Sequence, residues 1–334
     1  MQQPDKAKPI ILNAAELPEW TNAELNKIFT VLDLPKSPEA ASAFLKEHGH
    51  KVRGIALRKT KIDAAFLDTV PAVEIISSYS AGLDNLDVQA AKARGISIEN
   101  TSHILAEDVA NAAVGLALAV TRDFVNADAF VRLGAWPEHG QYPLGRSISR
   151  MKIGIVGLGT IGSAIAKRLA AFGSTLAYFG PNRKPVDIPY YDDVVRLAQD
   201  SDMLILTCPL SPATHHLVNA AVIDALGPRG FIVNISRGAV VDESALITAL
   251  AADRIAGAAL DVFEHEPAVP EALIRDRRLV LTPHIGSATR ETRRSMAENV
   301  VDTLAGHFGI AGPRDKTASL DQADASAESL GAPA

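Results

Sequence analysis

Three glycines with the spacing of Gly157, Gly159 and Gly162 constrain the fold of this chain more than any other feature. An apolar strand is expected before them, an alanine-rich amphipathic helix at 163–172, and a second strand at 175–179. In this pattern the first glycine permits a tight turn, the second lets the backbone approach a pyrophosphate, and the third lets the helix pack closely on the sheet. The free NH groups at the helix start would bind the anion. A glycine turn without a ligand is the alternative, but the coincidence of strand, glycines and helix favours a dinucleotide site.

The end of the second strand indicates which dinucleotide binds. About 20 residues after the first glycine, an NAD-preferring site carries an acid that holds the ribose 2′-hydroxyl. This chain has Gly180 in that region, followed by Pro181, Asn182, Arg183 and Lys184. A loop with two cations and no acid suits a 2′-phosphate, because Arg and Lys pair with phosphate oxygens and no carboxylate repels them. A solvated turn with incidental charges is the alternative. We therefore expect NADP(H) as the preferred cofactor, with NAD(H) as the second choice.

Size and composition indicate a two-domain α/β protein with no nucleic-acid or membrane partner. A chain of 334 residues exceeds what one hydrophobic core usually supports. The formal net charge of −6 offers no basic surface for nucleic acid. The longest apolar stretch, 109–120, is too short to span a bilayer, and residues 1–12 lack the apolar core of a signal peptide. The single cysteine, Cys208, excludes an internal disulfide and fits a reducing compartment. We expect a cytoplasmic location.

Strand and helix signals alternate along the chain. In the first part, short strands are expected at 10–12, 28–32, 54–57, 74–78 and 95–100. A helix at 106–126 leads to the second part, where further strands are expected at 203–207, 231–235, 257–260 and 279–281. This alternation describes parallel, doubly wound sheets. Segment 130–147 is expected to be a long irregular loop, 289–305 a final helix that returns to the first domain, and 311–334 a disordered tail.

Three side chains suited to hydride-transfer chemistry follow three of these strands: Arg237, Glu266 and His284. Active groups in parallel sheets gather at the carboxyl ends of the strands. The planar fork of an arginine binds the carboxylate of a 2-oxo acid. A histidine beside an acid can donate a proton to a carbonyl and accept one from an alcohol, since imidazole titrates near neutrality. Each residue also has a structural interpretation, as a surface cation, a solvated acid and a buried histidine, but their coincidence at three strand ends favours a site.

Other candidates are weaker. The small residues at 80–84 follow a strand and could offer NH groups to an anionic substrate, although an ordinary strand-to-helix turn fits equally well. The pairs His215–His216 and His48–His50 lack a neighbouring Cys or acid at metal-ligand spacing, so we expect no metal site. Cys208 is expected to be a buried small apolar residue rather than a nucleophile.

Together these motifs resemble the D-isomer-specific 2-hydroxyacid dehydrogenase family over nearly the whole chain, from about Gly54 to Phe308. The resemblance is carried by the glycine turn and by segments 80–87, 234–238, 241–243, 260–267 and 283–287. Within the family, 77–84 and 178–184 look most similar to the glyoxylate/hydroxypyruvate reductases, including plant hydroxyphenylpyruvate reductases. His103 is a small departure, since many relatives have proline there.

The resemblance implies two Rossmann-like domains with doubly wound parallel sheets, the nucleotide domain being inserted in a smaller, flavodoxin-like catalytic domain. On this basis the catalytic domain comprises 1–100 and 286–310, and the NAD(P)-binding domain 101–285. It also implies a homodimer formed largely through the nucleotide domains, with Trp136 reaching the partner subunit's substrate pocket.

The same resemblance assigns a role to each site residue. Arg237 would bind the substrate carboxylate and carbonyl, His284 would donate the proton, and Glu266 would raise the pKa of His284 and orient it. Backbone groups of Ala81 and Gly82 would hold the substrate carboxylate, with Ser287 and Trp136 completing the substrate-binding set. Cofactor contacts are expected from Gly157, Gly159, Thr160, Ile161, Gly162, Asn182, Arg183, Lys184, Cys208, Pro209, Thr214, Ile235, Asp261, His284 and Gly286, with Asp261 near the nicotinamide amide.

The reaction expected is NADPH-dependent reduction of a small 2-oxo acid, of the glyoxylate or hydroxypyruvate type, to the D-2-hydroxy acid. One alternative is a nucleotide-sensing, corepressor-like binding protein on the same fold. Another is a sister dehydrogenase that acts on phosphoglycerate, formate or phosphite. The substrate is not determined by sequence, because pocket volume depends on how Leu57, Arg58, Tyr79 and Trp136 fold together.

Overall fold

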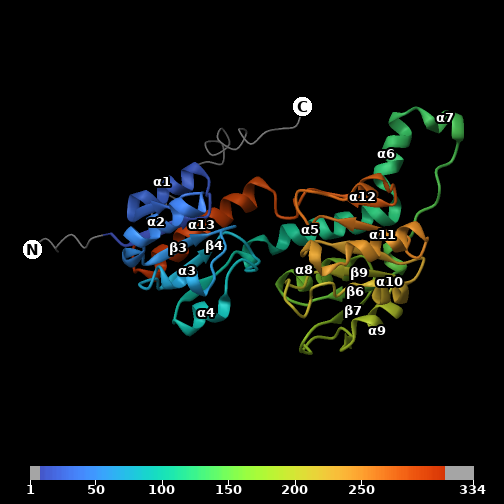
Figure 1. Ribbon diagram of the computed structural model, residues 1–334. Helices are drawn as coiled ribbons and strands as arrows, with labels where there is room; N and C mark the ends of the chain where they lie inside the picture. Colours follow the sequence, from blue (N-terminus) through green and yellow to red (C-terminus); the bar gives the residue numbers. More distant parts are fainter. Residues whose placement is uncertain (1–7, 313–334) are drawn as a thin grey trace, which may run out of the picture. The chain divides into compact units, whose positions relative to one another are not determined.

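The computed structural model describes residues 8–312, so the tail expected beyond Gly312 lies outside the described residues. The chain divides into two compact units (Figure 1). The first combines the N-terminal part up to Ile104 with the C-terminal part from Arg290, and the second is Leu105–Thr289. The boundary after Ile104 falls in the first turn of the helix Ser102–Arg122, and the boundary after Thr289 falls directly before the helix Arg290–His307. These bounds differ by four residues from the two expected from the sequence.

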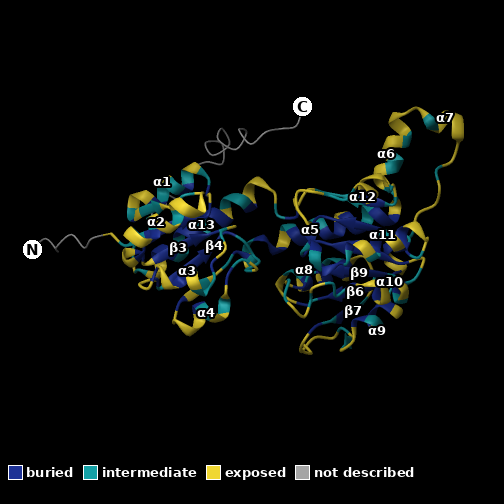
Figure 2. Ribbon diagram, in the orientation of Figure 1, coloured by how far each residue is buried: buried dark blue, intermediate teal, exposed yellow. Residues whose placement is uncertain are grey.

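The first unit is a five-stranded parallel sheet with helices. The strands are β1 (Ile10–Ala14), β2 (Thr30–Asp33), β3 (Gly54–Leu57), β4 (Ile75–Ser78) and β5 (Ser97–Glu99). Their order, β2-β1-β3-β4-β5, is that of the flavodoxin-like sheet. The helices are α1 (Glu19–Ile28), α2 (Pro38–His48), η1 (Gly49–Lys51), α3 (Ala64–Asp68), α4 (Val88–Ala93) and α13 (Arg290–His307). The two central strands β3 and β4 are buried throughout, as a parallel sheet covered on both faces requires (Figure 2).

The second unit is a seven-stranded parallel sheet. Its strands are β6 (Lys152–Val156), β7 (Thr175–Phe179), β8 (Tyr190–Tyr191), β9 (Met203–Leu206), β10 (Phe231–Asn234), β11 (Gly257–Leu260) and β12 (Leu279–Leu281). The order β12-β11-β10-β9-β6-β7-β8 reverses direction between β6 and β9. In open α/β sheets this reversal is the topological switch point, outside which ligands bind. The expected fold class, with two Rossmann-like units, is confirmed.

Helices of the second unit surround this sheet, and one segment extends away from it. The helices are α5 (Ser102–Arg122), α6 (Phe124–Arg132), α7 (Ala135–His139), η2 (Ile148–Arg150), α8 (Thr160–Ala171), α9 (Val194–Gln199), α10 (Ala220–Leu226), η3 (Gly238–Val240), α11 (Glu243–Ala251) and α12 (Glu271–Arg275). The segment α6–α7 projects from the rest of the unit (Figure 1).

The segment after α5 corrects two expectations. The helix expected at 106–126 ends at Arg122, because Asp123 adopts a left-handed conformation with φ 53° and a new helix starts at Phe124. The irregular loop expected at 130–147 instead begins with the end of α6 and contains α7. Gly134, with φ 71°, joins these helices, and Pro137 lies in the first turn of α7, where a missing NH leaves no helical hydrogen bond unmade. Gly134 and Pro137 therefore belong to a helix junction and not to an irregular loop.

Helix α5 is long and apolar enough, by length and composition alone, to cross a membrane. It is longer than the apolar stretch expected at 109–120. However, about half of the helix is buried inside the protein, including Val109, Ala113 and Ala117. Packing in the core accounts for its composition.

Candidate active site

The glycine turn lies at the switch point, where the ends of β6 and β9 approach closely. Gly157 has φ 101°, and a Cβ there would lie 2.8 Å from the backbone nitrogen of Cys208. A Cβ at Gly162 would lie 2.2 Å from the carbonyl oxygen of Gly157. The Thr207 hydroxyl donates to this same carbonyl oxygen. Only glycine satisfies both positions, so the turn after β6 and the start of α8 are held together by backbone contact.

The start of α8 suits the pyrophosphate of a dinucleotide. Gly159 is the N-cap residue, and no side chain caps this helix end. The first NH groups of a helix have no partners within it, and the helix dipole favours an anion there. A Cβ at Gly159 would meet nothing within 4 Å, so open space lies against the backbone at this glycine. Thr160 and Ile161, the first residues of α8, present their NH groups at the same end.

The segment after β9 closes the other side of the switch point. Cys208 is 8% exposed and packs in the hydrophobic core. Burial raises the pKa of its thiol to about 11, so the thiol is protonated at neutral pH, which fits a small apolar residue rather than a nucleophile. The Thr214 hydroxyl donates to the Pro209 carbonyl oxygen over 2.6 Å and accepts from the Ser211 NH over 2.8 Å, which fixes the loop that follows.

The loop after β7 presents cations without acidic partners. Asn182, Arg183 and Lys184 are exposed. Over residues 8–312 neither Arg183 nor Lys184 forms an ion pair with a carboxylate of the chain. Unpaired cations in an exposed loop can bind an anionic group such as a ribose phosphate.

The carboxyl ends of β10, β11 and β12 lie side by side at one edge of the sheet, because these strands are parallel neighbours. Arg237 lies three residues beyond β10, is half-buried, and donates from its guanidinium to the Ser236 carbonyl oxygen over 2.7 Å. A Cβ at Gly238 would lie 1.8 Å from the Phe263 carbonyl carbon. The backbone beside Arg237 is therefore in contact with the segment that follows β11.

His284 and Glu266 form a pair at this edge. The Nδ1 atom of His284 lies 2.9 Å from Oε2 of Glu266, and the other oxygen of Glu266 accepts from the Phe263 NH over 3.1 Å. The carboxylate therefore has a fixed orientation, and its contact at Nδ1 leaves Nε2 of His284 as the outer nitrogen. The His284 side chain is 48% exposed, so the imidazole ring is partly open to solvent. The expected His–Glu arrangement is present, while its function stays a prediction.

A buried carboxylate holds the His284 segment in place. Asp261 is only 2% exposed. Its carboxylate accepts from the Thr282 hydroxyl over 2.6 Å and from the NH groups of Ile285 and Gly286 over 2.8 Å each. His284, with φ 57°, donates its NH to the Asp261 carbonyl oxygen over 2.8 Å. These bonds stabilise a backbone conformation that a non-glycine residue rarely adopts. The expected contacts of Asp261 and Gly286 with the cofactor stay predictions, as does the role of half-buried Ser287.

A histidine pair near this edge has an acidic neighbour that is not evident from the sequence. The Nε2 atom of His216 lies 2.8 Å from Oε1 of Glu264, although the sequence shows no acid close to it. Ligand atoms of His215, His216 and Glu264 lie within 4.8 Å of one another. The two imidazole rings stack with centroids 4.0 Å apart and an interplanar angle of 28°. The sequence argument did not include Glu264, because this residue is 48 positions from His216 in the chain. The expectation of no metal site stays a prediction.

Ala81 and Gly82 belong to the first unit, in the turn after β4. The Ala81 carbonyl oxygen accepts from the Asn100 side chain over 3.1 Å, and the Thr101 hydroxyl donates to the Tyr79 carbonyl oxygen over 3.0 Å. Both residues are half-buried. The Ala81 carbonyl is thus held by the protein, and the NH groups of Ala81 and Gly82 stay candidates for a substrate carboxylate.

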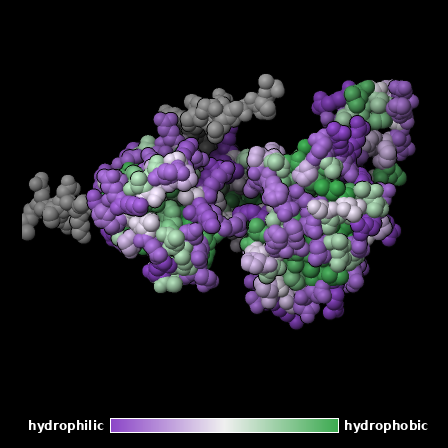
Figure 3. All heavy atoms as spheres, viewed as in Figure 1, coloured by the Kyte–Doolittle hydropathy of each residue, from purple (hydrophilic) through white to green (hydrophobic). Residues whose placement is uncertain are grey.

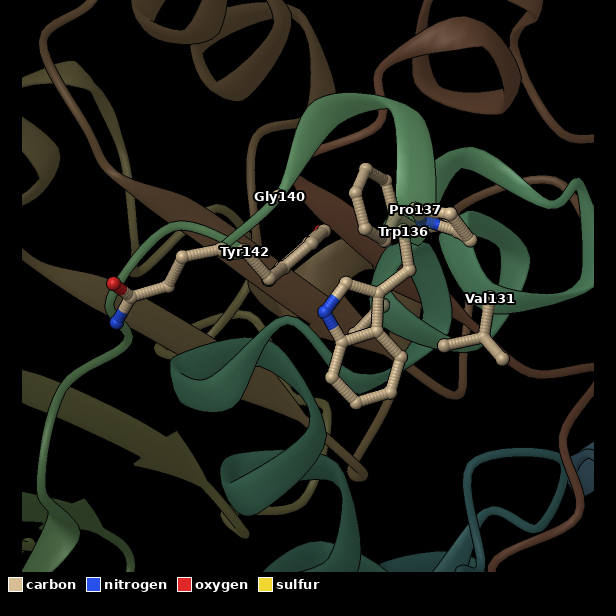
Figure 4. A pocket seen from close by; sticks show the side chains of 8 residues that line it. Val131, Trp136, Pro137, Gly140 and Tyr142 are labelled. Carbon is tan, nitrogen blue, oxygen red and sulfur yellow. The ribbon is translucent and has the colours of Figure 1, made fainter.

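Trp136 lies on the projecting α6–α7 segment. Its side chain is 60% exposed and faces a hollow of about 710 Å³ (Figure 4). The hollow is lined by α6, α7 and the loop that follows, with the residues Ala127, Phe130, Val131, Trp136, Pro137, Gly140, Gln141 and Tyr142. Trp136 therefore lies on other elements of this unit than His284, which follows β12.

The fold and the glycine turn define the class: an α/β protein with a dinucleotide site at the switch point of its larger sheet. Residues 114–286 match the family model of the D-isomer specific 2-hydroxyacid dehydrogenase NAD binding domain. Hydroxyphenylpyruvate reductase from Plectranthus scutellarioides is 42% identical over 300 residues, 89% of this chain and 95% of the relative. Glyoxylate/hydroxypyruvate reductase A from Arabidopsis thaliana is 44% identical over the same shares.

Solved structures agree. An NADPH-dependent glyoxylate/hydroxypyruvate reductase from Sinorhizobium meliloti, in complex with NADP and malonate, is 38% identical with a TM-score of 0.83 and covers 93% of this chain and 98% of that chain. The chain belongs to the D-isomer specific 2-hydroxyacid dehydrogenase family. It is thus an oxidoreductase with a nicotinamide cofactor, and the general reaction that its relatives support is reduction of 2-oxo acids.

Two glycine substitutions should separate folding from cofactor binding. Gly238→Ala places a methyl group against the backbone of Phe263, and we expect it to lower the Tm by about 5 °C or more.

In Gly159→Ala the new methyl group meets open space, so the Tm of this variant should stay near that of the wild type. Its affinity for the dinucleotide should fall by about tenfold or more, because the methyl group lies where the pyrophosphate would approach. Thermal unfolding and calorimetric titration measure the two effects. Unchanged dinucleotide affinity in Gly159→Ala would contradict the assignment of this turn.

Proposed function

We propose that this chain reduces a small 2-oxo acid of the glyoxylate or hydroxypyruvate type to the D-2-hydroxy acid, with NADPH as the preferred hydride donor. The unit Leu105–Thr289 would bind the nucleotide, and the other unit would contribute Ala81 and Gly82 to the substrate. The observation that carries the proposal is the His284–Glu266 pair, held by Asp261 at the edge of a nucleotide-binding sheet. The printed functions of the relatives support the substrate class.

The residues divide the chemistry between them. Gly157, Gly159, Thr160 and Ile161 would hold the pyrophosphate, and the bound nicotinamide supplies the hydride. The Arg237 guanidinium would bind the substrate carboxylate and polarise the carbonyl, which stabilises the negative charge that develops on oxygen. Nε2 of His284 would donate a proton to that oxygen. Glu266, at Nδ1, would keep the ring oriented.

Replacement of His284 tests the proton donor. In His284→Asn the side chain has no titrating nitrogen, and we expect kcat to fall by about 100-fold or more while the Kd for NADPH changes little. Steady-state assays with glyoxylate and hydroxypyruvate give kcat, and fluorescence titration gives Kd. His215→Asn, which removes another histidine of the same unit, is the matched control and should keep the wild-type kcat. A His284→Asn enzyme with most of its activity would reject this role.

Cofactor preference rests on the loop after β7. Arg183 and Lys184 are exposed, have no acidic partner over residues 8–312, and follow Gly180, where an NAD-preferring site would place an acid. The 2′-phosphate of NADPH is an anion that could form ion pairs with both cations. This supports NADPH over NADH.

Replacement of Arg183 tests this preference. Arg183→Ala should raise the KM for NADPH by about tenfold, because it removes one charge-assisted contact to the phosphate, and leave the KM for NADH unchanged. Arg196→Ala removes an exposed cation outside the loop and serves as the control. A wild-type enzyme whose KM for NADH equals or lies below that for NADPH would disprove the preference.

A panel of 2-oxo acids tests the substrate. Glyoxylate, hydroxypyruvate, hydroxyphenylpyruvate and 2-ketogluconate cover the substrates in the names of the relatives. We expect the highest kcat/KM with glyoxylate or hydroxypyruvate, measured as NADPH oxidation. A clear preference for either larger acid would assign the chain to another substrate group of the same family.

The α6–α7 segment supports a homodimer. Val131, Leu133 and Trp136 are 54%, 81% and 60% exposed, and hydrophobic residues appear on this projecting segment in the space-filling view (Figure 3). Exposed apolar side chains that cluster on one segment are typical of an interface. In a dimer built here, Trp136 would contact the partner subunit.

A charge on this surface should separate the subunits. Leu133→Asp places a carboxylate in the proposed interface, and we expect a dimer-to-monomer shift in light scattering at micromolar concentration. Ile274→Asp changes another exposed apolar residue, 55% exposed on α12, and should stay dimeric. A wild-type chain that is monomeric, or a Leu133→Asp variant that remains dimeric, would contradict the proposed interface.

A further inference from the structure

We propose that Tyr178 and Tyr190 are positioning residues for the 2′-phosphate, because their hydroxyl groups fix the two ends of the loop 180–184 that carries Arg183 and Lys184. This inference rests on the proposed preference for NADPH. Neither tyrosine is a sequence-predicted cofactor contact. Each would act through the loop backbone rather than by touching the cofactor.

Tyr178 fixes the far end of the loop. It lies in β7 and is 1% exposed, among the largest fully buried side chains of the protein. Its hydroxyl accepts a hydrogen bond from the backbone NH of Lys184 over 2.6 Å. The NH of Val186 donates to the Lys184 carbonyl oxygen over 2.9 Å, so the chain turns directly after this point. A buried hydroxyl whose ring cannot move is a rigid anchor for an exposed backbone.

Tyr190 fixes the near end. It lies in the two-residue strand β8, opposite Tyr178 in the parallel pairing of β7 and β8. Its hydroxyl donates to the Gly180 carbonyl oxygen over 3.1 Å. The rings of the two tyrosines pack with centroids 5.3 Å apart, so both hydroxyl groups extend from one packed aromatic pair. Strand β8 has only two residues, so its main effect on this loop is the position that it gives to Tyr190.

The loop between these anchors has exposed cations and little other support. Residues 181–187 are exposed, and the side chains of Arg183 and Lys184 have no carboxylate partner over residues 8–312. A loop of this kind would lose conformational freedom when it binds a phosphate. Anchors that restrict it beforehand reduce this loss and strengthen binding. The effect is specific for NADP(H), because NAD(H) has no 2′-phosphate to contact the cations.

Removal of each hydroxyl tests the inference. Tyr178→Phe and Tyr190→Phe keep the aromatic packing but lose the anchor. We expect the Kd for NADP⁺ to rise by about threefold to tenfold in each, the range for one lost hydrogen bond, and the Kd for NAD⁺ to change by less than about twofold. Isothermal titration calorimetry on the purified full chain measures binding without turnover.

Tyr191→Phe is the matched control. Tyr191 lies beside Tyr190 in β8, but its hydroxyl donates to the Asp200 carboxylate over 2.8 Å rather than to the loop. This variant should bind both cofactors as the wild type does. Loss of NADP⁺ affinity in Tyr191→Phe equal to that in Tyr190→Phe would show a general effect on β8 and overturn the inference.

A double substitution tests whether Tyr190 acts through Arg183 and Lys184. In Arg183→Ala/Lys184→Ala the cationic side chains that would bind the 2′-phosphate are absent, so adding Tyr190→Phe should raise the Kd for NADP⁺ no further. Additive losses would mean that Tyr190 acts independently of the cations and would overturn the inference. This arm needs only Tyr190, so it tests the role of Tyr190 even if Tyr178→Phe fails to fold.

The outcomes separate this inference from the proposal on which it rests. If the wild type binds NADP⁺ no more tightly than NAD⁺, the NADPH preference fails and the positioning role fails with it. If the wild type prefers NADP⁺ while both tyrosine variants bind it with wild-type affinity, the positioning role alone is disproved. If both variants lose NAD⁺ and NADP⁺ equally, the tyrosines stabilise the fold only, which also disproves it.

Discussion

The close approach of the ends of β6 and β9 is the constraint on which the site depends. Gly157 lies against the Cys208 backbone, so a side chain there would push the two strand ends apart. A side chain at Gly162 would push the start of α8 away from the Gly157 carbonyl group. These contacts lie at the switch point of the seven-stranded sheet. Beside them, open space lies at Gly159, at the uncapped start of α8. A dinucleotide site is therefore built from backbone, with side chains adding selectivity at its rim.

The same sheet holds the proposed acid-base residues by a second set of contacts. Asp261, buried after β11, binds the segment after β12 through three hydrogen bonds and supports the left-handed conformation of His284. Gly238 brings the backbone beside Arg237 against Phe263, whose NH binds Glu266. The segments after β10, β11 and β12 are thereby coupled into one rigid edge. Such an edge can keep a proton donor oriented while the mobile parts of an enzyme move.

Much of this was predictable from sequence, since short apolar runs locate strands such as β9, β10 and β12, and parallel order brings their ends together. The His284–Glu266 contact follows from that logic. Three features could not be predicted. Strand β8 consists of two tyrosines and has no apolar run. Gly134 and Pro137 look like breakers, although one joins two helices and the other fits a first helical turn. The His216–Glu264 contact and the bonds of Asp261 depend on tertiary register, which no local pattern encodes.

The central claim is that one edge of the seven-stranded sheet holds both the dinucleotide and the His284–Glu266 pair. The most direct measurement is a crystal structure of the full chain with NADP⁺ and oxalate, a non-reacting analogue of a small 2-oxo acid. The account predicts the pyrophosphate at the NH groups of Gly159–Ile161, the 2′-phosphate at Arg183 and Lys184, and the nicotinamide beside His284, with oxalate between His284 and Arg237. A dinucleotide bound elsewhere, or a nicotinamide remote from His284, would contradict it.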